Sequence, residues 1–318
     1  MKIGLDIMGG DFAPAEAILG VQQFFEQEPD SSVHLLLIGD AIAAAPYLSL
    51  LEPYHHRFTF VEATEVIGMN EHPTKALKEK PNSSIAIGFG LLAKGKSDAF
   101  ISAGNTGAML VGAMYTVKAI DGILRPTICS PIPRIDGSYN FMLDVGINAD
   151  CKPEHLVQFA QLGTLYARHI LGIDNPRVGL LNIGEEEGKG NILAQATYPL
   201  LKELEGINFI GNVEGRDVFL EKAEVIVCEG FVGNVTLKMA ESIYDIFKIQ
   251  KGFQDPFLEN FNFEKYGGTP ILGINSPVFI GHGISHAPAF KNLIISAGKF
   301  ISSGLTETFK QNFKNPVE

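Results

Sequence analysis

The residues best suited to chemistry lie in a glycine-rich loop that holds a single lysine. Residues 178–191 read V-G-L-L-N-I-G-E-E-E-G-K-G-N, so a short apolar run leads into glycines, three glutamates and Lys189. Glycines on both sides of Lys189 allow the backbone to approach a ligand closely. A strand, a glycine loop and a helix in this order present backbone N–H groups and one side chain to an anion. We therefore expect Lys189 to bind an anion; a solvated turn is the alternative.

Two familiar phosphate motifs are missing from the sequence. The segment from Gly184 to Lys189 is one residue too short for a Walker A loop, and Gly190 stands where that motif has serine or threonine. No G-x-G-x-x-G follows a predicted strand. Nucleotide binding therefore has no motif support.

A second loop of small residues, S-A-G-N-T-G-A at 102–108, follows another apolar run. Such a composition makes a poor core and a good cradle, because a ligand can approach the glycine backbone while amide and hydroxyl groups supply hydrogen bonds. A tight strand-to-helix turn would explain the glycines but not the whole run. The candidate substrate-binding residues here are Ser102, Gly104, Asn105, Thr106 and Gly107.

A third loop, E-G-F-V-G-N-V-T-L-K at 229–238, places Gly233 and Asn234 where a strand hands over to a helix. An amide at such a point can donate to a developing oxyanion, or it can cap the helix. Cys228 is not expected to be a nucleophile, because the neighbouring Glu229 opposes thiolate formation.

Three further candidates come from a serine pair and a histidine. Ser83 and Ser84 can hold an oxyanion or open a helix, and they lie in the lysine-rich stretch 72–96. His282, between two glycines at a strand end, is a candidate substrate contact. His286 follows four residues later without an acidic or cysteine partner at ligand spacing, so no metal site is expected.

The composition limits the classes of partner. The 318-residue chain is 46% hydrophobic, carries a formal charge of −11 and has three cysteines without C-x-x-C spacing. The negative charge argues against nucleic acid, whose phosphates demand a basic face. No apolar run approaches the roughly 18 residues that span a bilayer. These features predict a cytoplasmic protein with reduced cysteines.

Apolar runs that alternate with helical segments must position the candidate loops. The alternation predicts a mostly parallel sheet covered on both faces, in which ligands bind outside the carboxyl ends of the strands. We expect a helix from Pro14 to about Phe25, with Asp11 satisfying its free N–H groups rather than contacting substrate, which is the alternative. A long helix is expected over 153–171. The expected strands cover 2–7, 33–38, 99–102, 178–183, 224–228 and 277–280, with a strand and loop over 141–150.

A phenylalanine-rich stretch, 243–265, has apolar residues at spacings near three and four. The spacing predicts an apolar helical face interrupted by Gly252 and Pro256. Such a face is usually core or dimer interface; contact with a membrane or an acyl chain is the sharper interpretation. We expect residues 1–318 to form a single unit, or two interwoven lobes, with 243–265 as a helical excursion.

Six motifs together resemble a known family. They are M-G-G-D-F-A-P (8–14), S-A-G-N-T-G-A (102–108), D-C-K-P-E-H-L (150–156), N-I-G-E-E-E-G-K-G-N (182–191), G-F-V-G-N-V-T-L-K (230–238) and Y-G-G-T-P-I-L-G (266–273). In this order, over residues 2 to about 304, they resemble the PlsX family of phosphate acyltransferases of bacterial phospholipid synthesis. The resemblance implies a three-layer α/β/α fold with a mostly parallel sheet, isocitrate/isopropylmalate dehydrogenase-like and related to phosphotransacetylases, and usually a homodimer.

The resemblance also implies a reaction. A long-chain fatty acyl group passes from acyl carrier protein to inorganic phosphate and gives acyl phosphate, without metal, nucleotide or other cofactor. Phosphate attacks the thioester directly, so the site must bind a dianion and stabilise a tetrahedral oxyanion. On this hypothesis Lys189 binds or steers phosphate, Asn234 donates to the oxyanion, and the 102–108 loop lines the phosphate or thioester cradle.

The implied partner, acyl carrier protein, is acidic, as is this chain. Docking then needs a local basic patch, and the stretch 72–96 has lysines at 75, 78, 80, 94 and 96 against Glu79 alone. We expect these lysines to aid docking or phosphate capture. The family further implies peripheral contact with the inner face of the membrane, for which 243–265 is the candidate, and a downstream glycerol-3-phosphate acyltransferase as partner.

Three alternatives stay open at this point. A phosphotransacetylase acting on short acyl-CoA is the nearest enzyme, and chain-length dependence separates the two. A hydroxy-acid dehydrogenase of the same fold would need metal-binding aspartates and a nicotinamide site, neither of which can be located. A non-catalytic scaffold that binds acyl carrier protein has no use for an oxyanion site, so the Lys189 loop and Asn234 speak against it.

Overall fold

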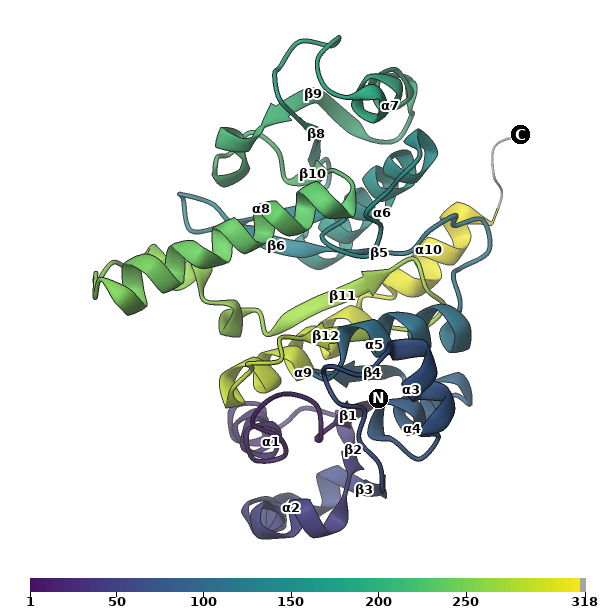
Figure 1. Cartoon of the computed structure of the whole chain (residues 1–318), viewed down its shortest axis with the longest axis vertical. Coiled ribbons are helices and arrows are strands. Elements are labelled where there is room, and N and C mark those ends of the chain that lie inside the picture. Colours follow the sequence, from purple (N-terminus) through teal and green to yellow (C-terminus); the bar gives the residue numbers. More distant parts are fainter. Residues whose placement is uncertain (315–318) are drawn as a thin grey trace. The chain divides into compact units, whose positions relative to one another are not determined.

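The structure, a computed structural model, describes residues 1–314 and divides into two compact units (Figure 1). Unit 1 comprises residues 1–119 and 264–306, and unit 2 comprises 120–263 and the chain from 307 on. The boundary falls inside the last helix, α10 (Leu305–Phe313). Each unit has its own sheet, built mostly of parallel strands.

The sheet of unit 1 has the strand order β3-β2-β1-β4-β12-β11 and is parallel except between β11 and β12. Figure 1 shows α1 and α9 on one side of these strands and α3 and α4 on the other. The strands are β1 (Lys2–Asp6), β2 (His34–Gly39), β3 (Phe58–Glu62), β4 (Ala99–Ser102), β11 (Gly268–Leu272) and β12 (Val278–Gly281). The helices are α1 (Ala15–Gln27), α2 (Ala41–Leu48), η1 (Ser49–Arg57), α3 (Pro73–Glu79), α4 (Ser84–Ala93), α5 (Thr106–Gly112), η2 (Ala113–Val117), η6 (Phe263–Lys265) and α9 (Ala287–Ser302).

In the core of unit 1, aromatic side chains pack directly against glycines, in the space that a larger side chain would need. Phe100 of β4 lies so close to Gly88 of α4 that a Cβ there would be 2.1 Å from its ring. The rings of Phe89 and Phe100 are packed edge to face, with their centroids 5.1 Å apart. The Phe89 ring also occupies the space where a side chain at Gly112 would lie. Helix α4 therefore packs tightly against β4 and holds the loop that leaves that strand.

The sheet of unit 2 has the strand order β6-β7-β10-β8-β9 and is parallel except between β6 and β7. The strands of this sheet are β6 (Ser130–Pro133), β7 (Tyr139–Leu143), β8 (Arg177–Asn182), β9 (Asn208–Glu214) and β10 (Val225–Val227), and the short β5 (Thr127–Ile128) is not one of them. The helices are α6 (Pro153–Leu171), α7 (Ile192–Glu203), η3 (Gly215–Phe219), α8 (Gly230–Ile243), η4 (Tyr244–Gln250) and η5 (Leu258–Phe261). The carboxyl ends of β7, β10 and β8 lie at one edge, because these three neighbours are parallel.

Sequence reasoning located most elements but missed β3, β5, β6, β9 and β11. Strands β6 and β11 contain proline, which lacks the N–H that a sheet ladder requires, so their sequences do not read as strands. Each forms an antiparallel pair, with β7 and β12 respectively. The predicted strands 2–7, 99–102 and 178–183 and the predicted helix 153–171 are confirmed to within a residue.

The predicted helix cap at Asp11 is wrong. Helix α1 starts at Ala15 with Pro14 at its N-cap and no side-chain cap bond. Asp11 lies four residues before the first helical residue, too early for an N-cap. Its side chain is exposed, and its backbone N–H donates to Gly283 O at 2.7 Å.

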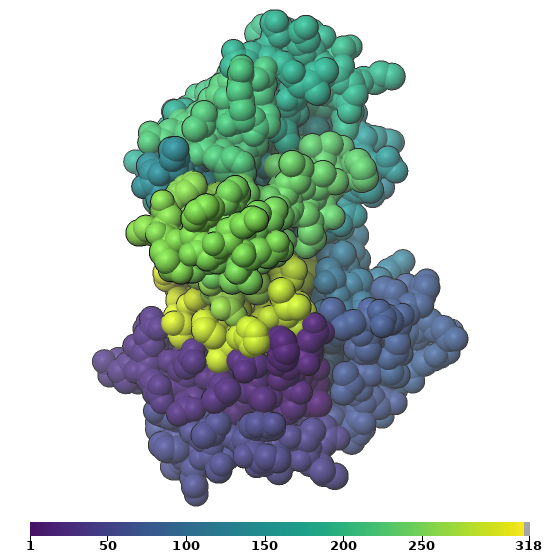
Figure 2. Space-filling model, turned by 60° about the vertical axis from the view of Figure 1, so that its left-hand side comes forward, coloured from purple at the N-terminus to yellow at the C-terminus, as the bar shows by residue number. Residues whose placement is uncertain are grey.

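The phenylalanine-rich stretch is only partly helical. Helix α8 continues into η4 and ends near Gly252, whose φ of +70° suits glycine. The short η5 follows the intervening loop. Figure 2 shows this stretch, in light green, at the surface. Within 1–314, no helix is both long and apolar enough to cross a membrane.

Candidate functional site

The Lys189 loop of unit 2 is held in shape by side chains from its two ends. Asn182, the last residue of β8, donates from Nδ2 to Lys189 O at 3.1 Å. From α7, Gln195 donates to Gly188 O at 3.1 Å and to Gly190 O at 3.0 Å. Gly190 has a φ of +98°, and a Cβ there would lie 2.3 Å from Asn182 Oδ1, so only glycine fits. The loop then enters α7 through Asn191, which caps the helix by accepting from Ala194 N at 2.8 Å.

The glutamates of the loop are tied to lysines of other elements. Lys222 Nζ donates to Glu185 at 2.6 Å, and Lys202 Nζ donates to Glu187 at 2.9 Å. Lys189 is different. Its side chain is exposed, its stem passes over Gly184, and no hydrogen bond or ion pair engages its ammonium group among residues 1–314. The loop therefore presents one uncommitted cation at the N-terminus of a helix, which suits an anion.

The first turn of helix α8, which follows β10 in the chain, packs against the residue that follows β7. Glu229 caps it by accepting from Val232 N at 2.9 Å. At Gly233 a Cβ would lie 1.9 Å from the carbonyl oxygen of Asp144, the residue that follows β7. Gly233 thus lets the helix and the strand end meet, which is a packing role; its predicted contact with substrate stays a prediction.

Asn234 lies inside α8 and does not cap it, so the capping interpretation of this residue is wrong. Its side chain is exposed and faces Gly146 of the loop after β7, where an added Cβ would lie 3.6 Å from Asn234 Oδ1. The Asn234 amide is therefore positioned by a long helix at the same edge of the sheet as the Lys189 loop. Its role as an oxyanion donor stays a prediction.

A buried aspartate, Asp144, organises the turn opposite α8. Its carboxylate accepts from Ile128 N at 3.0 Å, from Asn148 N at 2.6 Å and from Ile147 N at 3.1 Å. Burial raises the pKa of Asp144, although these hydrogen bonds act in the opposite direction. Burial, followed by the charges of Glu229 and Asp144, also raises the pKa of the Cys228 thiol well above its ordinary value. Cys228 is therefore unsuited to be a nucleophile, as predicted.

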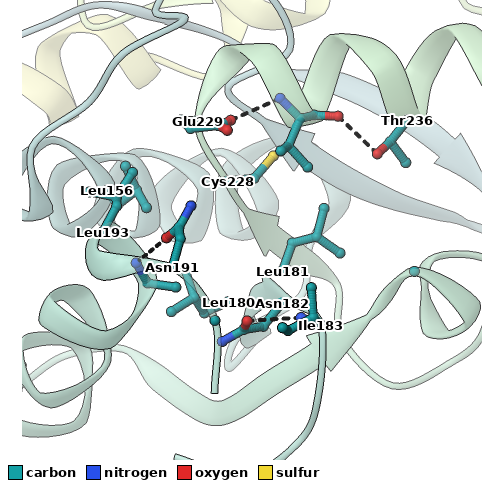
Figure 3. A pocket seen from close by; sticks show the side chains of 14 residues that line it. Leu156, Leu180, Leu181, Asn182, Ile183, Asn191, Leu193, Cys228, Glu229 and Thr236 are labelled. Atoms are coloured by element: carbon teal, nitrogen blue, oxygen red, sulfur yellow. Dashed lines mark hydrogen bonds between the residues drawn. The ribbon is translucent and has the colours of Figure 1, made fainter. Parts of the chain in front are cut away.

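A cavity of about 540 Å³ lies between the Lys189 loop and the start of α8. Figure 3 shows Leu180 and Leu181 of β8, Leu156 of α6 and Leu193 of α7 around it, with Cys228 at its end toward α8. Val232 and Thr236 line it from α8, whereas Asn234, half a turn away, is not among the lining residues. Sequence reasoning missed this cavity, because its leucines look like ordinary core residues until the strand and helices are placed.

In unit 1, Asp6 and Ser102 form the centre of the other predicted cradle. Ser102 Oγ donates to Asp6 Oδ2 at 2.7 Å and accepts from Gly104 N at 2.9 Å, and both side chains are buried. Ser84 also hydrogen-bonds to Asp6, and burial raises the pKa of that carboxyl group. A Cβ at Gly9 would lie 2.6 Å from Gly104 N, so the two glycine loops touch. Sequence reasoning did not identify Asp6 as a candidate site residue. The signal that could have done so is the position of a charged residue at the end of an apolar run.

Asn105 is committed to holding the protein chain together. Its Oδ1 accepts from Ala108 N at 2.9 Å and so caps α5, while its Nδ2 donates to the carbonyls of Gly68, Met69 and Glu71 at 2.9–3.1 Å. Thr106, next in the chain, is exposed. Of the two, Thr106 is the better placed to meet a ligand.

The other predicted site residues of unit 1 are Ser83, Gly107 and His282, and they differ in how far packing and hydrogen bonds within the protein already engage them. Ser83 is buried and caps α4, accepting from Ala86 N at 3.3 Å and donating to Lys80 O at 2.8 Å. Gly107 packs against Pro73, which would lie 2.4 Å from an added Cβ. His282 is half-buried, in the loop whose Gly283 accepts from Asp11 N. Within 1–314, no group of three or more His, Cys, Asp or Glu side chains is arranged to hold a metal ion.

Comparison with known proteins explains this combination of loops. A family model described as "Fatty acid synthesis protein" matches residues 1–308. A protein named phosphate acyltransferase from Desulforamulus reducens is 42% identical, covering 99% of this chain and 98% of its own length. The chain belongs to the PlsX family of phosphate acyltransferases. Another PlsX-family relative of the same name, from Brevibacillus brevis, is 40% identical over 99% of this chain and 98% of its own length.

The fold is shared more widely than the sequence. A phosphotransacetylase from Streptococcus pyogenes superimposes with a TM-score of 0.64, at 18% identity, over 95% of this chain and 94% of that one. The mixed α/β fold with mostly parallel strands, predicted from the alternation of apolar runs and helical segments and from the resemblance to PlsX, is therefore confirmed.

Proposed function

We propose that the protein transfers a long-chain acyl group from acyl carrier protein to inorganic phosphate and thereby makes acyl phosphate for phospholipid synthesis. An oxygen of hydrogen phosphate would attack the thioester carbonyl carbon and an oxyanion would form. The C–S bond would then break as the oxyanion collapses, and the leaving thiolate would take up the proton that the phosphate gives up. Acyl transfer to phosphate is supported by family membership. The observation that carries the site is the uncommitted Lys189 ammonium group in an otherwise fully braced loop.

In this proposal Lys189 neutralises the attacking phosphate and Asn234 donates to the oxyanion. Lys189 comes from the loop after β8 and Asn234 from helix α8, both at one edge of the same sheet, which is the edge where ligands of parallel sheets bind. A cation and an amide donor directed at the reacting group favour the transition state, because both interact with the charge that develops there.

The test uses purified protein, long-chain acyl carrier protein and phosphate, with hydroxylamine to trap acyl phosphate. Losing one such donor costs roughly 10²–10³ in kcat, so we expect that loss for Lys189→Ala and for Asn234→Ala. Lys299→Ala, which removes an exposed cation of α9, is the control and should retain activity. Normal kcat in both site variants would refute the assignment. Turnover of acetyl-CoA without turnover of acyl carrier protein would instead indicate a phosphotransacetylase.

Docking of acyl carrier protein is proposed to use lysines of the stretch 72–96. Lys80 is not available, since its ammonium group donates to Glu71 at 2.5 Å and to Val66 O at 2.8 Å. Lys78, Lys94 and Lys96 are exposed and can meet an acidic partner. Raising the salt concentration should therefore increase the KM for acyl carrier protein; a salt-independent KM would count against this surface.

The exposed face of α8 is our proposed homodimer surface. Phe231, Val235 and Met239 follow one another at intervals of four residues, so they lie on one side of the helix, and each is between 46% and 68% exposed. At the end of η4, Ile249 and Phe253 are 64% and 55% exposed and are the proposed contact with a membrane surface. Met239→Glu should shift the protein toward monomer in sedimentation, and Phe253→Ser should reduce vesicle binding without changing the oligomeric state.

A further inference from the structure

We infer that the cavity beside the Lys189 loop holds the hydrocarbon chain of the acyl group that is transferred. The inference rests on the proposed function and assigns a place to one part of its substrate. The cavity runs from fully buried leucines to the surface, because Leu156 and Leu180 are 2% and 1% exposed while Ile183, which also lines it, is 82% exposed. A chain entering past Ile183 would bury its tail among the leucines.

The walls of the cavity offer little to a polar ligand. Each polar side chain that lines it already makes a hydrogen bond with nearby backbone (Figure 3). Asn182 accepts from Ile183 N at 2.8 Å, Asn191 from Ala194 N at 2.8 Å and Glu229 from Val232 N at 2.9 Å. Thr236 likewise donates to Val232 O at 2.9 Å. The rest of the cavity wall consists predominantly of leucine, isoleucine, valine and alanine side chains.

This lining discriminates between the parts of an acyl donor. A pantetheine arm or an adenine ring carries several amide or ring nitrogen groups that would exchange their water for the few polar groups of this lining, which is costly. A polymethylene chain has no such groups and gains from leaving water. The hydrocarbon chain is therefore the occupant that the cavity favours.

The size of the cavity fits the same occupant. A methylene takes up about as much volume as a water molecule, roughly 30 Å³, so a cavity of about 540 Å³ has room for on the order of 15 methylenes. The Lys189 loop forms one wall, with Asn182 joining the cavity lining to the Lys189 carbonyl. A chain seated inside would thus leave its carbonyl end at the mouth, beside the proposed phosphate site.

Two substitutions that fill the cavity test the inference. Val232→Trp acts from α8 and Ala194→Phe acts from α7, so one remains informative where the other fails to fold. Leu200→Trp adds bulk to α7 outside this cavity and is the matched control. Each methylene buried in an apolar site strengthens binding roughly four-fold, so excluding two of them should cost roughly 16-fold. We expect kcat/KM for a C16 donor to fall by at least ten-fold relative to a C4 donor, with the control unchanged.

A direct binding measurement separates this inference from the proposed function. A fluorescent long-chain fatty acid is titrated into wild-type protein and both filled variants, without phosphate or acyl donor. Binding that is displaced by palmitate and weakened ten-fold in the variants supports the chain site even where no acyl phosphate is formed. Displacement by coenzyme A but not palmitate overturns it. So does an active enzyme whose filled variants lose C4 and C16 activity equally, or neither.

Discussion

Gly233→Ala should destabilise the protein although it places a better helix former in α8. Inside a helix, alanine is favoured over glycine by about 1 kcal/mol. At position 233, however, the new Cβ would lie 1.9 Å from Asp144 O and 3.0 Å from Cys228 Sγ. The first distance is about 1.5 Å short of ordinary contact, and the obstacle is backbone rather than a movable side chain. Relief requires α8 to move away from β7.

The movement has a cost in stability and a cost in activity. Overpacking of this kind costs roughly 1–3 kcal/mol, and displacement of the helix also stretches the bond from Gly230 N to Asn148 O, now 2.7 Å. We expect a net loss of about 1 kcal/mol after the gain in helix propensity, since overpacking costs roughly 1–3 kcal/mol and alanine returns about 1 kcal/mol. Because Asn234 moves with the helix, a shift near 1 Å should reduce kcat about 100-fold.

The assay is urea unfolding together with steady-state kinetics, and the chain provides a matched control. Gly90 lies inside α4 with nothing within 4 Å of an added Cβ. Gly90→Ala should therefore stabilise by about 0.5–1 kcal/mol and leave kcat unchanged. If Gly233→Ala proved as stable as Gly90→Ala, α8 would not rest on the β7 carbonyl as described, and the reasoning would fail.

Three further predictions concern the loop and the buried thiols. Lys222→Ala should lower kcat several-fold, because it releases Glu185 and thereby loosens the segment that carries Lys189. It should also reduce stability, because the buried carboxylate of Asp217 loses the same lysine as its partner; unchanged kinetics would exclude the bracing role. Glu186→Gln should lower the KM for phosphate about two- to five-fold at low ionic strength, since it removes an exposed negative charge from the same loop; an unchanged KM would show that Glu186 lies too far from the anion. Burial raises the pKa of the Cys129 thiol, so the unfolded state ionises first above about pH 8.5, and Cys129 alone should then lower the free energy of unfolding by about 1.4 kcal/mol per pH unit. Cys151 and Cys228, whose pKa values are raised as well, add to the slope. Cys129→Ala should make that slope shallower, as measured by urea unfolding between pH 8.5 and 10.

Local patterns were enough to locate the loops of the candidate site. The apolar run before Lys189 is β8, the helical segment after it is α7, and the run before 102–108 is β4. These elements are long or strongly apolar, so no tertiary contact was needed to identify them. The fold as a whole came from the resemblance to a family, because strand order is set by contacts between distant residues.

Hydrogen-bond commitments, in contrast, could not be predicted from the sequence. Asn105 looked like a free amide among glycines, yet it joins three carbonyls that lie more than thirty residues earlier in the chain. Ser102 likewise looked like a ligand, but its hydroxyl group both donates to Asp6 and accepts from Gly104. Sequence shows which groups can bind, and only the structure shows which of them are already engaged.

The same distinction explains how an acidic loop in an acidic protein can favour an anion. The loop carries three glutamates and one lysine, but Lys222 and Lys202 neutralise two of the glutamates from outside. The backbone is braced by Asn182, Asn212 and Gln195, so these side chains rather than the loop cation make the structural bonds. Within residues 1–314, Lys189 is thereby left without an ion-pair partner before the start of α7, where the helix dipole adds to its charge and Glu186 is the one glutamate of the loop without a lysine partner. The net charge of a protein governs its long-range attraction or repulsion of other charged molecules. Binding of an anion at one site depends instead on whether a cation there lacks an ion-pair partner.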